Sequence, residues 1–151
     1  MAVGGVIFLS QFTYVLPIHV AAVFITLFFV VIADLHALSW LIGKSETLPA
    51  WRMDKLHQVV SLGLLVVVTS GIVMFWPVRD FLIYEQAFQV KALFVLALIV
   101  NSFFIQKHLG VATNKRFSDL SWKARRALLL SGAVSTTCWV GAFVSAQFIG
   151  L

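Results

Sequence analysis

Three histidines and one lysine have the clearest capacity for chemistry in this sequence. They are His19, His36, His57 and Lys91, and each lies within or at the edge of a long apolar stretch. An ionisable side chain inside such a stretch is costly, so each one is a candidate for a functional role. A neutral imidazole offers a lone pair to a metal. Haem iron in a helical bundle takes one or two axial ligands, usually His or Met.

Position along the expected helices divides these residues into two groups. The outer group is His19, Met74 and Lys91, each within about two turns of the outer end of its apolar segment. The inner group contains His36 and His57. His19 and His57 differ in depth by on the order of 15 Å in a hydrocarbon core of ~30 Å, so we do not expect them to bind the same iron.

The outer group predicts a b-type haem with His19 as its metal ligand. Lys91 would pair with a haem propionate or act as a ligand, and Met74 would be a further cofactor-binding candidate. His36 and His57 would form a second, bis-histidine site at the inner face. Each residue also has a simpler interpretation. The histidines could form hydrogen bonds between helices, Lys91 could extend to the lipid headgroups, and Met74 could only pack.

Polar residues near the inner face suggest further contacts. Asp34 lies only two residues before His36, so the two side chains point in different directions on a helix. We expect Asp34 to form an ion pair with Arg52 or Lys55 of the next helix, although a proton or ion pathway through Asp34 and the histidines is also conceivable. Thr47 or Asp54 could cap that helix.

The segments that carry these residues indicate a membrane protein. Of the 151 residues, 61% are hydrophobic and 11% are charged, against about 45–50% and about 25% in soluble domains. The mean hydropathy is +1.00. We predict an all-α integral membrane four-helix bundle, a single transmembrane domain over residues 1–151. Its spans are expected at about 12–42, 51–76, 87–107 and 124–149. Pro17 either begins the first span or kinks a longer helix, and Pro77 ends the second.

The distribution of positive charge predicts the orientation. Nine of the eleven Lys and Arg residues lie in or beside the loops that follow spans one and three. By the positive-inside rule, both termini are outside and these loops are cytoplasmic. We therefore expect a multi-pass protein of the bacterial inner membrane, with the lipid bilayer as its partner and no nucleic acid. Small residues in the spans allow close helix packing and would tolerate a homo-oligomer.

Several kinds of soluble-enzyme chemistry have no motif in the sequence. It contains no Gly-rich phosphate loop, no Cys-x-x-Cys, no His-Glu-x-x-His and no nucleophile triad. Its one cysteine, Cys138, excludes a disulfide scaffold. The six acidic residues are dispersed, which disfavours a cage for a hard metal ion.

Three motifs carry a resemblance to known membrane proteins. They are PIHVAAVFITLFFVVIADLHAL from Pro17, TSGIVMFWP from Thr69 and AFQVKALFVLALIVNSFF from Ala87. Their order resembles small bacterial four-span membrane proteins related to the CopD-like membrane domain. It is also distantly similar to the four-span, haem-binding protoporphyrinogen oxidase. The resemblance covers about Leu16 to Phe104.

This resemblance implies a haem-associated or redox-associated bundle, with His19 and Lys91 at the positions that matter for haem in the oxidase. The expected function is that of a b-type haem-binding membrane protein with an electron-transfer or oxidoreductase role. Its partner would be quinone or another membrane redox protein. A non-catalytic membrane subunit or a small permease without haem is an alternative. A third is copper handling, which would favour Met and His clusters at the outer face.

Overall fold

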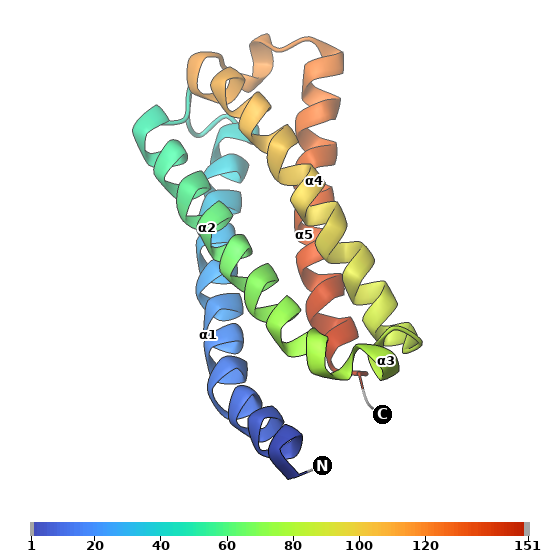
Figure 1. Cartoon of the computed structure of the whole chain (residues 1–151). Coiled ribbons are helices and arrows are strands. Elements are labelled where there is room, and N and C mark those ends of the chain that lie inside the picture. The colour runs from blue at the N-terminus through green and yellow to red at the C-terminus, as the bar shows by residue number, and fades with distance from the viewer. Residues whose placement is uncertain (1, 150–151) are drawn as a thin grey trace.

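The structure is a computed structural model that describes residues 2–149, without the side chains of residues 2–12, 108, 109 and 112. In this part the chain forms four long helices and no strand (Figure 1): α1 (Ala2–Leu41), α2 (Ala50–Phe75), α4 (Gln86–Asn114) and α5 (Trp122–Ala146). Three short helices lie in the connections: η1 (Trp76–Val78), α3 (Arg79–Leu82) and η2 (Phe117–Asp119). The predicted all-α four-helix bundle is confirmed.

Each long helix contains a segment that is long and apolar enough to cross a membrane. These segments are Thr13–Leu41, Ala50–Leu82, Gln86–Lys107 and Trp122–Ala146. An apolar helix of about 20 residues spans the hydrocarbon core. The chain therefore has the architecture of a multi-pass membrane protein.

Local sequence explains where the helices begin and end. Gly43 has a φ of 75°, the left-handed conformation that commonly ends a helix, and it follows the last residues of α1. Ser121 precedes α5, and its side chain accepts a hydrogen bond from a backbone amide of the first turn. The N-cap of α2 is Pro49, with no side-chain hydrogen bond. The expectation that Thr47 or Asp54 caps α2 is therefore wrong.

Two helices extend further than a simple reading of their sequences suggests. Pro17 lies inside α1, which is one helix and not a span preceded by a separate segment. α4 continues past Lys107 to Asn114. Gly110 does not interrupt it, because an isolated glycine costs a helix only about 1 kcal/mol.

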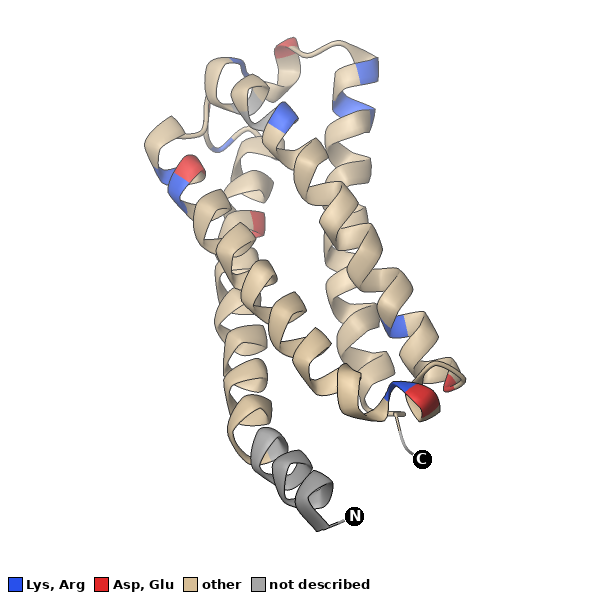
Figure 2. Cartoon of the chain, viewed as in Figure 1, with Lys and Arg blue, Asp and Glu red and all other residues tan. Residues whose placement is uncertain are grey.

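The four helices are arranged as two hairpins. α1 packs along α2, and α4 packs along α5, whereas the contact between α2 and α4 is much smaller. The α1–α2 and α4–α5 connections lie at one end of the bundle, and both termini and α3 lie at the other (Figure 1). Most Lys and Arg residues gather at the first end (Figure 2), which we call the basic end. The opposite end is called the terminal end.

Apolar side chains fill two layers of the bundle. The layer near the basic end has a buried core of Trp40, Leu48, Met53, Leu56 and Leu120. The second layer, near the middle of the helices, has a core of Val30, Leu64, Leu98, Cys138 and Trp139. The middle layer separates polar residues near the terminal end from those nearer the basic end.

Candidate functional site

His19 of α1 is held in one orientation by α2. Its Nδ1 lies 2.8 Å from Ser70 Oγ, and its ring also forms a hydrogen bond with the backbone of Val67. The Ser70 hydroxyl donates to carbonyls of its own helix, at 2.6 Å to Val66 and 3.2 Å to Val67. Because that proton is already used, the Ser70 oxygen accepts from His19 Nδ1–H. With the proton on Nδ1, the lone pair of the neutral imidazole is on Nε2.

Three further residues lie near His19 at the terminal end. A Cβ atom at Gly71 would lie 3.6 Å from His19 Cε1, so Gly71 of α2 lies beside the imidazole ring. Lys91 of α4 lies within electrostatic range of the imidazole. Met74 lies one turn beyond Ser70 on the same face of α2. The structure thus brings His19 and Lys91 of the predicted outer group near one another, whereas Met74 lies one turn further along α2.

These residues have the donor chemistry that a haem requires. An oriented imidazole with a free Nε2 is the common axial ligand, and its second nitrogen is usually held by a hydrogen bond, as Ser70 holds His19. The half-buried Lys91 has no anionic partner within the described residues, so its ammonium is free to pair with a carboxylate. No group of three or more His, Cys, Asp or Glu side chains in that part could hold a metal ion. Haem iron needs only one or two protein ligands.

His36 lies in a different environment from His57. Its Nδ1 is 2.8 Å from the Ile32 carbonyl, to which it donates. Its Nε2 is 3.4 Å from Arg52 Nη1, and because a guanidinium can only donate, Nε2 accepts. Both nitrogens of His36 are therefore occupied by protein contacts. The structure does not bring His36 and His57 together as two ligands with free lone pairs.

The expected ion pair of Asp34 with Arg52 or Lys55 is wrong. Asp34 instead accepts a hydrogen bond from Thr136 Oγ1 of α5 at 3.2 Å. In the described part of the chain, the ion pairs are Arg79–Asp80 and Arg116–Glu46. The physical reason is the rotation of α1, which directs Asp34 towards the second hairpin and not towards α2.

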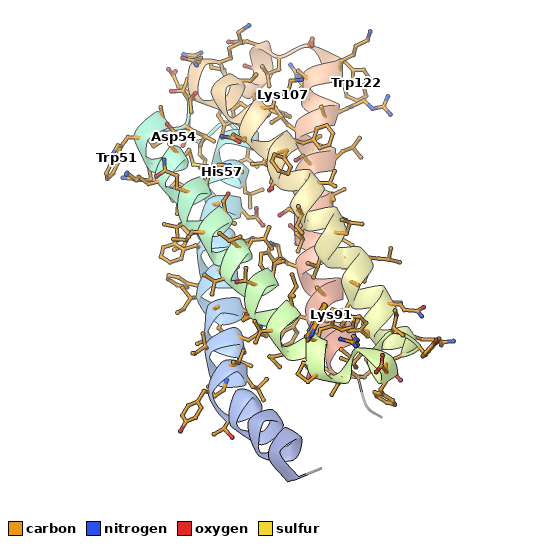
Figure 3. The ribbon with its side chains drawn as sticks, viewed as in Figure 1. Trp51, Asp54, His57, Lys91, Lys107 and Trp122 are labelled. Atoms are coloured by element: carbon orange, nitrogen blue, oxygen red, sulfur yellow. The ribbon has the colours of Figure 1, made fainter. Side chains whose placement is uncertain are left out.

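Asp34 and His57 line one cavity near the basic end. Its volume is about 560 Å³. Residues of α1, α2 and α5 form most of its wall, together with Leu48 of the α1–α2 connection and Ile105 of α4. His57 is half-buried, and its ring forms no hydrogen bond to any residue that the structure describes. His57 and Lys91 lie towards opposite ends of the bundle (Figure 3). Ser70, which marks the level of His19, follows His57 by 13 residues, or roughly 20 Å along α2.

Sequence reasoning missed two polar contacts of these sites. Ser70 is one of the small span residues expected only to allow close helix packing, yet it orients His19. Thr136 lies in a span with no expected site residue, yet it donates to Asp34. Residues three or four apart share a helix face, but which face meets another helix depends on packing, so the sequence held no direct signal for either contact. The side chain of the fourth histidine, His108, lies outside the described residues.

Comparison with known proteins does not identify a family or a function for this chain. No family model matches the chain, and no curated protein or solved structure shows significant similarity to it.

Proposed function

We propose that this chain is a b-type haem-binding membrane protein with an electron-transfer or oxidoreductase role. The haem would bind at the terminal end, with His19 Nε2 as an axial ligand to iron. Lys91 would contribute its ammonium to a propionate. Haem would supply one-electron chemistry, whereas the protein holds the ligand, sets its tautomer and provides an apolar environment.

The observation that carries this proposal is the orientation of His19. The Ser70 hydroxyl donates to the Val66 carbonyl and accepts from Nδ1–H of His19, so the lone pair of the neutral imidazole is on Nε2. The half-buried Lys91, which lies near His19 and has no ion-pair partner among the described residues, adds to this argument.

The membrane orientation belongs to the same proposal. Nine of the eleven Lys and Arg residues lie in or near the connections at the basic end. By the positive-inside rule this end is cytoplasmic and both termini are outside, in the inner membrane of a bacterium. The haem would then lie near the outer face.

An absorption spectrum of the purified protein tests the haem proposal. Protein made with ample haem and purified in detergent should show a Soret band, with sharp bands after reduction by dithionite. His19→Ala should remove most of the bound haem, because no other described side chain at that level offers an oriented imidazole.

His36→Ala is the matched control. It also removes a histidine from α1, but one whose two nitrogens are already occupied, so it should retain the haem. A wild-type protein without a Soret band would contradict the proposal and favour a non-catalytic subunit or permease. Equal loss of haem from both variants would contradict the assignment to His19.

A further inference from the structure

The cavity near the basic end has the size and composition of a small-molecule site. Its volume of about 560 Å³ is within the range of about 300–1,000 Å³ that is typical of ligand pockets. Most of its wall is apolar, as expected of such pockets. It lies between α1 and α5, two helices with little direct contact.

Small residues of α5 help to create this space. Ser131, Gly132, Ala133 and Ser135 all line the cavity. A Cβ atom added at Gly132 would meet no other atom within 4 Å. By contrast, a Cβ atom at Gly141 further along α5 would lie 2.5 Å from the Phe94 ring. α5 therefore packs closely in one region and leaves open volume at Gly132.

The two titratable groups on the cavity wall lack strong partners. Asp34 accepts one hydrogen bond, from Thr136 at 3.2 Å, and that hydroxyl also lies 3.2 Å from the Gly132 carbonyl. Asp34 has no cationic partner in the described part of the chain. His57 forms no hydrogen bond there. Polar groups that converge on an apolar cavity without partners can be satisfied by polar atoms of a ligand.

The charges around the cavity favour a neutral ligand. Asp34 would repel an anionic headgroup inside the cavity. The Lys and Arg residues of the basic end repel cations that approach from that side (Figure 2). The ligand would need an apolar body for the walls, and two separated polar atoms for Asp34 of α1 and His57 of α2.

We infer that this cavity binds a membrane-soluble ring compound with two oxygen substituents, of the quinone and quinol class. In the quinol form one hydroxyl would donate to the Asp34 carboxylate, and in either form the other oxygen would face His57. The ring would lie against the apolar wall, and the tail would extend between α1 and α5 towards the lipid. The inference concerns a different end of the bundle from His19 and does not depend on bound haem.

Quenching of tryptophan fluorescence by decylubiquinone tests this inference. Trp40 lines the cavity, and its indole Nε1 is fixed by donation to the Lys115 carbonyl at 3.1 Å. The wild-type protein in detergent should show saturable quenching. Trp40→Phe should lose that component and identify its source. The titration is repeated in His19→Ala, so that absence of haem and absence of quinone binding are separate results.

Two variants of the cavity wall give the expected changes. Gly132→Leu places a side chain in the open volume and should abolish saturable quenching, leaving only the linear effect of quinone in the micelle. Asp34→Asn should weaken competition by decylubiquinol against decylubiquinone by about tenfold, because a quinol hydroxyl donates to the Asp34 carboxylate whereas a quinone carbonyl does not. Gly110→Leu is the matched control. A Cβ atom at Gly110 also meets nothing within 4 Å, but Gly110 does not line the cavity.

Four results would overturn the inference, three of them from the quenching titrations. The first is quenching that is linear in every protein, which indicates partition into the micelle only. The second is saturable quenching that survives unchanged in Gly132→Leu. The third is an equal loss in Gly110→Leu. Competition by a phospholipid without a quinone ring, at equal concentration, would also contradict the quinone class and indicate a site for acyl chains.

Discussion

At the residue scale, the informative contact is the hydrogen bond between His19 and Ser70, because it determines which imidazole nitrogen is free. Ser70→Ala should leave the bundle intact but release the ring. We expect haem affinity to fall by roughly 10- to 100-fold, the usual effect of removing a partner that orients a metal ligand. Haem titration followed at the Soret band measures this loss, and the redox midpoint potential should shift as well.

Two variants separate the orientation of His19 from a general effect on α2. Ser70→Thr keeps the hydroxyl and should restore most of the affinity. Thr69→Ala removes a neighbouring hydroxyl that bonds only to carbonyls of its own helix, at 2.8 Å to Leu65 and 3.1 Å to Val66. It should therefore retain haem. If Thr69→Ala and Ser70→Ala lose haem equally, Ser70 is not a positioning residue.

At the element scale, we expect alanine substitutions at two glycines of the bundle to have opposite effects on stability. A Cβ atom at Gly63 of α2 would lie 2.1 Å from Thr26 Oγ1 of α1, and Thr26 is only 1% exposed. Gly63→Ala should therefore separate the helices of the first hairpin and destabilise the protein by roughly 1–3 kcal/mol. Thermal unfolding in detergent, followed by circular dichroism, gives the measurement.

Gly110→Ala provides the contrast in the same experiment. A Cβ atom at this position of α4 meets nothing within 4 Å. Alanine has the higher helix propensity, so this variant should be neutral or more stable by up to about 1 kcal/mol. Equal stability of the two variants would show that Gly63 is not a point of close approach between α1 and α2.

The elements were largely predictable from the sequence, whereas their mutual rotation was not. Apolar length predicted four helices, and Pro77 predicted the end of α2 near Phe75. The contact of Asp34 with Thr136 was not predictable, because neighbouring helices in sequence suggested a partner on α2. The rotation of each helix is set by many small contacts, such as Asn101 Nδ2 donating to the Ser131 carbonyl at 2.9 Å. No short sequence motif predicts the combined effect of these contacts.

At the scale of the whole molecule, the two hairpins place different chemistry at the two ends. The terminal end has an oriented imidazole and a lysine. The cavity near the basic end has a carboxyl and an imidazole. The apolar layer with Leu64 and Leu98 lies between them. At the basic end the connections of the two hairpins are joined by Arg116 and Glu46, and this contact raises the pKa of the Arg116 guanidinium.

The charge distribution predicts how this molecule is oriented in the membrane. Because most Lys and Arg residues gather at the basic end, we expect that end to be cytoplasmic.

Cysteine labelling tests this orientation. Cys138 is buried and can be replaced by Ala to give a cysteine-free background. Tyr84→Cys then marks the terminal end, where Tyr84 is 82% exposed, and Thr47→Cys marks the exposed α1–α2 connection at the basic end. A membrane-impermeant maleimide should label Tyr84→Cys in intact spheroplasts, but should label Thr47→Cys only after the membrane is opened. The reverse pattern would place the basic end outside and His19 near the cytoplasmic face, and would contradict the positive-inside assignment without affecting the haem test.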